Sequence, residues 1–403
     1  MKILFVHQNF PGQFKHLAPA LAARGHEVVG LGINGLQQAL PGVRYVTHNP
    51  QNADMPVSMR ELFAKMARGE SAARAMQALK AEGFVPDVVF AHSGWGEAFF
   101  IKDVFPSSRL LVYAEYFYGA EGGDSGFDPE FSSRTPEMLR SMRIKNTHLL
   151  HALSAADRGL SPTKFQRQQH PDWAQDRIDV IHDGIQTDIF CPNPAAFVTL
   201  GNGGPTLRPG DEVVTFVARQ LEPYRGYHIF MRALPKLLKL RPQARVVIVG
   251  GDGASYGSAA PAGSTWKNIF LSEVVSQLDR DRVYFVGSLP HAVLTQLFQV
   301  SAAHVYLTYP FVLSWSLMEA MSIGTLIIGS KTGPVEELIQ HGKNGLLTDF
   351  FDPEALAETV ADALKRRHKL TRLRDAARQT IVRGYDLERV CLPAQERLVT
   401  AAG

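Results

Sequence analysis

The chain has 403 residues, of which 45% are hydrophobic and 20% are charged, and its formal net charge is only +3. This balance is ordinary for a globular protein and excludes the concentrated basic surface of a nucleic-acid-binding protein. Because single cores stop growing beyond about 250–300 residues, the length predicts two domains. The apolar start Ile3–Val6 is too short for a signal peptide and no apolar run reaches 18 residues, so we expect a cytoplasmic protein.

Short apolar runs alternate with helical patterns along the whole chain. In the first half we expect strands at Ile3–Val6, Glu27–Leu31, Val88–Ala91 and Leu110–Tyr113, and a helix over Phe14–Arg24. In the second half we expect strands at 213–218, 245–249, 283–286, 303–307 and 325–328, and helices at 229–240, 292–299 and 316–321. Strands that alternate with helices predict an α/β fold with two doubly wound parallel sheets.

A segment rich in Gly, Pro and Asn separates the two halves. We predict a first domain over 1–192, a linker over 193–210, a second domain over 211–384, and a C-terminal helix over 385–403 that packs toward the first domain. Ligands of doubly wound sheets bind outside the carboxyl ends of the strands, so two facing domains would enclose a central cleft. The basic stretch after Leu364 fits either a solvated helix face or a peripheral contact with an anionic membrane.

Three features after strands suggest anion binding. Gly12 lies where the first strand meets the first helix, and a glycine there lets backbone amides approach an anion, although many such glycines serve packing only. Arg219 and Arg225 follow the first strand of the second half and could clamp a diphosphate, or be ordinary surface arginines. Gly250 belongs to a glycine-rich turn. This turn could lie close to a bound nucleotide, or it could be an ordinary loop at the end of a strand.

The segment Tyr309–Gly324 is the most informative one. It predicts a strand that runs through a loop into a helix capped by Ser314 or Ser316. The amides of Val312, Leu313 and Ser314 would then face a phosphate at the helix N-terminus. Glu319 is a lone acid in an apolar helix, so it needs a partner, either a ribose diol or a buried ion pair.

The order of these motifs resembles the retaining glycosyltransferases of family four, over nearly the whole chain. Arg219–Gly226 resembles their G-R-L-x-P-x-K-G loop, with Arg225 where lysine is usual. Four further blocks follow the family's patterns E-A-M-A-x-G-x-P, G-G-x-x-E, N-G-x-L and N-G-V, at Glu319–Thr325, Gly333–Glu337, Gly342–Leu347 and Asp183–Ile185.

The resemblance implies the GT-B fold, in which two Rossmann-like domains face each other. It also implies that Glu319 binds the ribose of a nucleotide-sugar donor. One departure stands out, because Phe311 occupies the position of the first glutamate of the family's E-x7-E motif, which helps to position the donor sugar. Either this subfamily holds its donor differently, for example through backbone amides and an aromatic wall, or activity has been lost.

The first half carries candidate residues for the acceptor side. The family often has a histidine where His92 ends its strand, and an imidazole there can hydrogen-bond the donor sugar. Trp95 could stack on a sugar ring, and Glu97 and Glu115 would complete an acceptor wall. His92 could instead be an ordinary loop histidine, and the aromatic residues beside Glu115 could belong to the core.

The sequence therefore predicts a hexosyltransferase with His92, Arg219 and Arg225 as catalytic residues. The donor would be a UDP, GDP or dTDP sugar, and the acceptor a glycan, a lipid-linked saccharide or a protein. No Asp-x-Asp metal motif is present, so no metal or other cofactor is expected. The alternatives are a nucleotide-sugar epimerase of the same fold and a nucleotide-binding pseudoenzyme.

Overall fold

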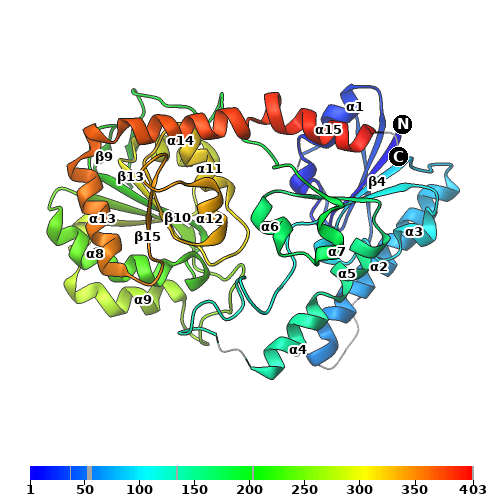
Figure 1. Ribbon diagram of the computed structural model, residues 1–403, viewed down its shortest axis with the longest axis horizontal. Helices are drawn as coiled ribbons and strands as arrows, with labels where there is room; N and C mark the ends of the chain where they lie inside the picture. The colour runs from blue at the N-terminus through cyan, green and yellow to red at the C-terminus, as the bar shows by residue number, and fades with distance from the viewer. Residues whose placement is uncertain (37, 52–56, 133–134, 202–203, 402–403) are drawn as a thin grey trace. The chain divides into compact units, whose positions relative to one another are not determined.

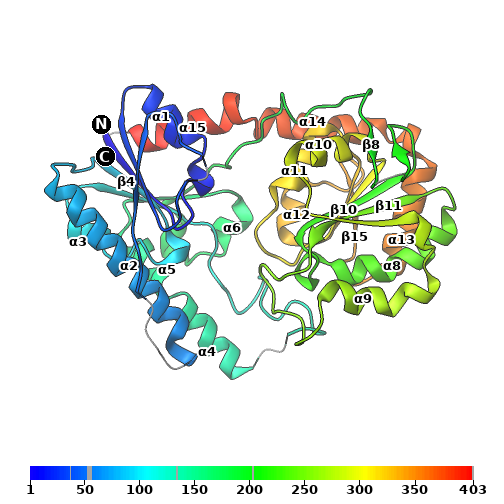
Figure 2. The same ribbon diagram turned by 180° about the vertical axis from the view of Figure 1, so that it is seen from behind.

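The computed structural model of the protein describes residues 1–36, 38–51, 57–132, 135–201 and 204–401, and it divides into two compact units (Figure 1). Unit 1 comprises residues 1–184 and 388–403, and unit 2 comprises residues 185–387. Each unit has a parallel sheet with helices on both faces (Figure 2). The expected α/β fold with two doubly wound sheets is confirmed.

Unit 1 contains a seven-stranded parallel sheet in the order β3-β2-β1-β4-β5-β6-β7. Its strands are β1 (Lys2–Val6), β2 (Glu27–Gly32), β3 (Val43–Thr47), β4 (Val88–His92), β5 (Arg109–Tyr113), β6 (Arg158–Ser161) and β7 (Ile178–Val180). Its helices are α1 (Leu17–Ala23), α2 (Val57–Ala81), α3 (Ile101–Val104), α4 (Pro136–Lys145), α5 (Thr147–Ala155), α6 (Lys164–Gln168), α7 (Asp172–Gln175) and α15 (Leu392–Thr400).

The central strands of unit 1 are buried on both faces, as parallel strands between helices should be. Leu4 and Val6 of β1 join a core with α2, α3 and α5. Ile3 and Phe5 point to the opposite face and join a core with α1 and α15. The C-terminal helix α15 is therefore part of unit 1, and Arg109 of β5 donates a hydrogen bond to the carbonyl of Leu398 (2.9 Å).

Unit 2 contains a six-stranded parallel sheet in the order β12-β11-β10-β13-β14-β15. Its strands are β10 (Val213–Gln220), β11 (Arg245–Gly251), β12 (Val283–Gly287), β13 (Ala303–Tyr306), β14 (Ile327–Ser330) and β15 (Leu346–Thr348). Its helices are α8 (Tyr227–Leu240), α9 (Trp266–Val274), α10 (His291–Val300), α11 (Trp315–Ile323), α12 (Gly333–Leu338), α13 (Pro353–Lys365) and α14 (Thr371–Gly384).

Two segments differ from the sequence expectation. The expected linker over 193–210 contains an antiparallel pair, β8 (Val198–Thr199) and β9 (Thr206–Leu207), whose apolar residues pack into a unit 2 core. The many turn-forming residues of this segment make the apolar residues of the two short strands hard to recognise in the sequence. The chain crosses between the units at 184/185 and 387/388 instead. Residues 202–203 of the expected linker and 402–403 of the expected C-terminal helix lie outside the described residues.

The expected first helix, Phe14–Arg24, is also divided. A single 3₁₀ turn spans Gly12–Phe14, and α1 starts only at Leu17. Gly25, with φ of +85°, follows the helix end as a stop signal should.

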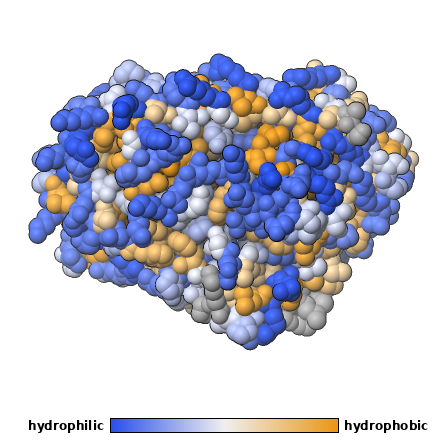
Figure 3. Space-filling view, in the orientation of Figure 1, coloured by the Kyte–Doolittle hydropathy of each residue, from blue (hydrophilic) through white to orange (hydrophobic). Residues whose placement is uncertain are grey.

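The basic stretch after Leu364 is partly structural. Arg366 pairs with Asp362, Arg374 donates to the carbonyl of Gly324 (2.7 Å), and Arg378 donates to the carbonyl of Phe190 (3.2 Å). Other basic side chains remain exposed, and hydrophilic residues gather at the upper left of Figure 3, where α14 lies in Figure 1. Among the described residues, no helix combines the length and the apolar character needed to cross a membrane.

Candidate functional site

The end of β10 and the turn after it carry the two candidate arginines of unit 2. Arg219 is the penultimate residue of the strand, whereas Arg225 ends the following turn, and their environments differ. Arg219 is exposed and makes no hydrogen bond or ion pair with any described residue. Arg225 is only 7% exposed. Between Arg225 and α8, Gly226 adopts φ of +67°, and a Cβ there would lie 2.4 Å from Cβ of Leu307. The tight turn at Gly226 therefore turns the chain from the arginine loop into the helix.

Arg225 is held by three acceptors at the carboxyl end of β13 and in the loop that follows it. Its Nη1 donates to Thr308 Oγ1 (2.8 Å), to the Val312 carbonyl (3.2 Å) and to the Tyr306 hydroxyl (3.3 Å). Burial alone would lower the pKa of Arg225, but interactions with Tyr306 and Tyr256 outweigh it, so the pKa is raised. The guanidinium is a fixed positive charge beside the Phe311–Ser314 loop.

Phe311 belongs to an aromatic cluster. It is 5% exposed, and its ring lies 5.1 Å from that of Tyr224 and 5.2 Å from that of Tyr256. Tyr309 packs on the other side of Tyr224, with the ring centroids 4.8 Å apart. Phe311 is thus part of an aromatic wall beside Arg225.

The loop before α11 fits the capping prediction, which is confirmed for Ser314. Its hydroxyl accepts a hydrogen bond from the amide of Ser316 (3.3 Å), while its own amide donates to the Tyr306 hydroxyl (2.8 Å). The Ser314 amide is therefore already engaged. Leu313 is buried in the unit 2 core, and the amides of Val312 and Leu313 donate to no described residue.

Glu319 has a protein partner that the sequence did not indicate. Its Oε1 lies 3.1 Å from Nε2 of His291, the first residue of α10. The Glu319 carboxylate is buried, whereas the His291 side chain is 60% exposed. The pair gives the lone acid of α11 a hydrogen-bond partner at the surface of the unit.

Gly250 serves packing. A Cβ at this position would lie 2.7 Å from Cδ2 of Leu221 and 2.9 Å from the carbonyl oxygen of Ala218. The close approach of the β10 and β11 loops therefore requires a residue without a side chain. This favours the strand-exit interpretation of the glycine-rich turn.

In unit 1, His92 ends β4 in a buried polar cluster. The imidazole is 1% exposed, and its Nδ1 accepts a hydrogen bond from the Gly94 amide (3.0 Å). Nε2 lies 3.6 Å from Glu115 Oε2, and Gln13 Nε2 donates to the other oxygen of Glu115 (3.2 Å). Glu115, with about a third of its side chain exposed, is the outward member of this cluster.

Gly12 lies against a second histidine. Its φ is +48°, and a Cβ there would lie 2.5 Å from Nε2 of His7. Burial, and to a smaller extent the neighbouring His92, lowers the pKa of His7 to about 3. The structure thus places a neutral imidazole beside Gly12, which begins a single 3₁₀ turn, while α1 starts only at Leu17.

Glu97 differs from the expectation of an acceptor contact, because it is 1% exposed. Neither of its carboxylate oxygens accepts a hydrogen bond from a described residue, and burial raises its pKa. Trp95 is half-buried with Lys65 Nζ 4.9 Å from its ring centroid. Burial, followed by repulsion from Arg68, lowers the pKa of Lys65 to about 8.

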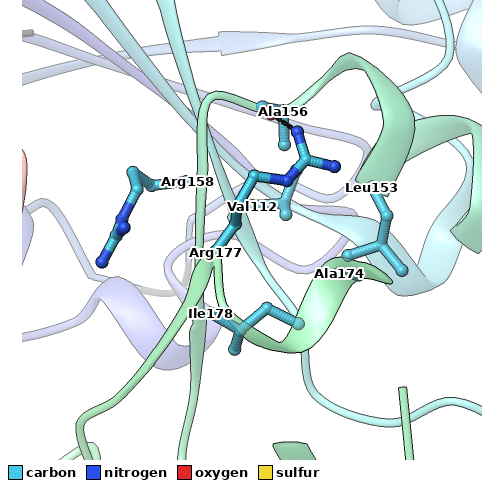
Figure 4. A pocket seen from close by; sticks show the side chains of 8 residues that line it. Val112, Leu153, Ala156, Arg158, Ala174, Arg177 and Ile178 are labelled. Carbon is cyan, nitrogen blue, oxygen red and sulfur yellow. Dashed lines mark hydrogen bonds between the residues drawn. The ribbon is translucent and has the colours of Figure 1, made fainter. Parts of the chain in front are cut away.

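A separate hollow in unit 1 lies between α5, β6 and α7 (Figure 4). Arg177 at its rim donates a hydrogen bond to the carbonyl of Ala156 (3.3 Å), and Arg158 pairs with Asp179. None of the predicted site residues lines this hollow. The candidate residues lie at the carboxyl edges of the sheets instead, as expected for doubly wound folds.

Family comparisons agree with this architecture. Residues 24–190 match the family described as Glycosyl transferase family 4 group, and residues 204–380 match Glycosyl transferases group 1. The chain belongs to the GT-B glycosyltransferases. The family expected from the sequence motifs is therefore confirmed at this level.

Curated relatives are similar to parts of this glycosyltransferase. A D-inositol 3-phosphate glycosyltransferase of Corynebacterium efficiens is 28% identical over 203 residues, which cover 48% of this chain and 44% of the relative. The same enzyme of Streptomyces avermitilis is 26% identical over 59% of this chain and 51% of its own length. The chain thus matches about half the length of these relatives.

Solved structures share the fold over the full length of the glycosyltransferase. Sucrose-phosphate synthase from Thermosynechococcus elongatus superposes with a TM-score of 0.74 at 17% identity, covering 100% of both chains. Anabaena HepE in complex with UDP gives a TM-score of 0.67 at 17% identity, with 99% of each chain covered. At these identities the comparison establishes the GT-B fold.

Sequence reasoning missed several residues around the sites of this glycosyltransferase. Glu222, in the same loop as Arg225, is fully buried. Tyr256 is exposed, and its ring packs against the guanidinium of Arg225. His291 begins α10 and pairs with Glu319, and Gln13 orients Glu115. The position of Glu222 within the arginine loop could have marked it as a site residue. The other residues could not be found in this way, because their roles depend on contacts between segments far apart in sequence.

Proposed function

We propose that this glycosyltransferase moves a hexose from a nucleoside-diphosphate sugar to a glycan, a lipid-linked saccharide or a protein. The observation that carries the proposal is the carboxyl edge of the unit 2 sheet, where the buried Arg225 contacts the Phe311–Ser314 loop and the exposed Arg219 lies at the end of β10. Guanidinium groups there would neutralise the charge that develops on a departing nucleoside diphosphate.

A nucleotide-sugar donor is supported by the solved relatives. Structures of Anabaena HepE are described as complexes with UDP and with UDP-glucose. In our proposal Glu319 binds the donor ribose in exchange for, or together with, His291, and the amides of Val312 and Leu313 face a phosphate. UDP, GDP and dTDP sugars are the candidates to test.

The two units would divide the work. Unit 2 would bind the donor, and the edge of unit 1 with His92, Trp95 and Glu115 would face the acceptor. We expect retention of the anomeric configuration by a front-face route, in which the leaving phosphate oxygen accepts the acceptor's proton. We also expect no metal requirement, because the arginines would supply the positive charge. A lipid-linked acceptor would bring the enzyme to the inner membrane face, with the exposed basic residues near α14 as its contact.

Phe311 would mark a subfamily that holds the donor sugar against an aromatic wall. The cluster of Phe311, Tyr224 and Tyr256 supports this interpretation. The competing interpretation is a nucleotide-binding protein without turnover.

A thermal-shift screen across UDP, GDP and dTDP sugars tests the proposal, since bound ligand stabilises the native state by mass action. The donor identified is then incubated with candidate acceptors, and NMR of the product gives the anomeric configuration. EDTA should leave the rate unchanged. Nucleotide binding without transfer or hydrolysis would establish the pseudoenzyme instead, and accumulation of an epimer without acceptor would establish an epimerase.

A further inference from the structure

The loop between β11 and α9 has an unusual composition. Residues 254–265 are Gly, Ala, Ser, Pro and Thr apart from one large side chain, Tyr256. Such a loop would normally have no fixed conformation of its own. In this protein, it is attached to the arginine loop at several points.

The strongest attachment is the carboxylate of Glu222. Glu222 is completely buried, and its two oxygens accept hydrogen bonds from the consecutive amides of Ser255 (3.1 Å), Tyr256 (3.3 and 3.4 Å) and Gly257 (3.2 Å). A second attachment lies two residues before Glu222, where Gln220 Oε1 accepts a hydrogen bond from the Gly253 amide (2.8 Å). Both acceptors belong to the segment that also carries Arg219 and Arg225.

A row of successive amides that converges on an anion is a common phosphate-binding arrangement. Here Glu222 fills that position, so the amides of 255–257 are not available to the phosphates of a ligand. Their function is therefore to fix the loop, and with it the side chain of Tyr256.

Tyr256 is fixed directly above the buried arginine. Its ring centroid lies 5.0 Å from Cζ of Arg225 and 5.2 Å from the ring of Phe311. The exposed fractions of these side chains differ sharply, because Arg225 is 7% and Phe311 5% exposed, whereas Tyr256 is 43% exposed. A ligand approaching Arg225 on this side meets Tyr256 first.

We propose that Tyr256 is the residue that controls access of the donor's diphosphate to Arg225, and that Glu222 is the positioning residue that holds Tyr256 over it. The inference rests on the proposed function, because it takes the diphosphate of a nucleotide sugar as the ligand. Binding then requires the ring to leave the guanidinium, and the closed position lowers the apparent affinity by the fraction of molecules that are open. Between turnovers the ring shields the positive charge.

Four variants test this: Tyr256→Ala, Tyr256→Phe, Glu222→Gln and the double variant. Inorganic pyrophosphate is the base-independent probe, and UDP, GDP and dTDP are titrated separately by calorimetry. We expect Tyr256→Ala to tighten pyrophosphate and nucleotide binding by about tenfold, as expected if the closed state predominates. Tyr256→Phe keeps the ring but removes the hydroxyl that interacts with Arg225, so it should give a clearly smaller gain than Tyr256→Ala. Ser258→Ala, an exposed change in the same loop, is the matched control.

Glu222→Gln should reproduce much of the tighter binding seen with Tyr256→Ala. A side-chain amide can accept hydrogen bonds with one oxygen only, so it would hold the amides of 255–257 less well, and its NH2 group would face other donors. The double variant should gain no more than Tyr256→Ala alone, because Glu222 acts through Tyr256. In transfer assays we expect the donor KM to fall while kcat changes little, a split that a general loss of structure would not produce. Arg225→Gln should abolish the gain given by Tyr256→Ala.

If the wild-type enzyme binds nucleotide and Tyr256→Ala binds it no more tightly, this inference is wrong while the proposed function stands. Weaker binding in Tyr256→Ala would also overturn it and would make Tyr256 a direct contact. If the wild type binds neither nucleotides nor pyrophosphate, the proposed function fails and the inference fails with it.

Discussion

The two units share one fold but stabilise their polar edges in opposite ways. Unit 1 buries neutral rings, since five of its buried histidines have pKa values lowered to about 3 or 4, namely His7, His48, His148, His170 and His182. Among the described residues of unit 2 only His304 is both buried and shifted in this way. Unit 2 instead encloses a permanent cation, Arg225, among hydroxyls and aromatic rings.

The comparison shows that the polar groups at the carboxyl edge of a doubly wound sheet can be either titratable side chains or permanently charged ones. A guanidinium keeps its charge at every physiological pH, whereas a buried imidazole depends on staying neutral. We therefore expect function to depend most strongly on the arginines of unit 2, and acid sensitivity to reside in unit 1.

The largest effect should come from Arg219→Ala. Loss of one charge that stabilises a leaving diphosphate should lower transfer by about 100- to 1,000-fold. Because Arg219 is exposed and contacts no described residue, the melting temperature should stay unchanged. Steady-state kinetics and thermal unfolding check both parts. Arg280→Ala, which removes another exposed arginine of unit 2, serves as the control, and full turnover in Arg219→Ala would remove Arg219 from the site.

Arg225→Ala should instead lower stability, by about 3 kcal/mol, because it leaves Thr308 and the Val312 carbonyl without their donor. Urea titrations of variants that keep only Trp315 report on unit 2, and those that keep only Trp173 report on unit 1. We expect the loss in unit 2 alone. An equal loss of stability in both units would contradict the view that Arg225 stabilises unit 2 alone.

Acid should unfold unit 1 before unit 2. A histidine whose folded pKa is lowered takes up its proton in the unfolded chain first, so its contribution is complete above about pH 6.5 and declines as the pH falls toward 4. At pH 5 each such buried histidine costs about 2 kcal/mol. The same single-tryptophan variants, titrated with urea at pH 7.5 and pH 5, should show a larger shift for Trp173 than for Trp315. Equal shifts would refute the contrast.

The smallest effect should come from Glu115→Gln in unit 1. The amide keeps the size of the side chain but removes the charge beside His92 and can turn only one oxygen toward Gln13. We expect about a tenfold loss in kcat/KM for the acceptor, as for one charged hydrogen bond, and an unchanged donor KM. Glu121→Gln, an exposed glutamate of the same unit, should have no effect.

Much of the fold was predictable because the central strands are continuous apolar runs. β1, β4, β5, β10 and β11 lie within two residues of their expected bounds, since both of their faces are buried. The edge strands β3 and β7 and the short β6 and β15 were missed, because few residues and mixed polarity give no periodic signal. The β8–β9 pair was not predicted because glycines and a proline between the two short strands resemble a linker in the sequence.

The site was predictable where one segment carries the information. The Ser314 cap follows from a hydroxyl placed directly before a helix, and Arg225 from its position after a strand. Arg219, which was expected after the same strand, is the penultimate residue of β10. The partners of the site residues could not be predicted in this way. His291 meets Glu319 across 28 positions and Tyr256 meets Arg225 across 31, and such contacts arise only when the sheet brings its loops to one edge.

The return of the chain to unit 1 has a consequence for biosynthesis. Val399 of α15 belongs to the same core as Phe5, and Glu396 pairs with Arg24. As the protein leaves the ribosome, residues 185–387 can complete their sheet while unit 1, although synthesised first, still lacks a wall of its core. The apolar face of unit 1 that α15 covers therefore stays exposed until residues 388–403 have been synthesised, and chaperones would bind the N-terminal unit first.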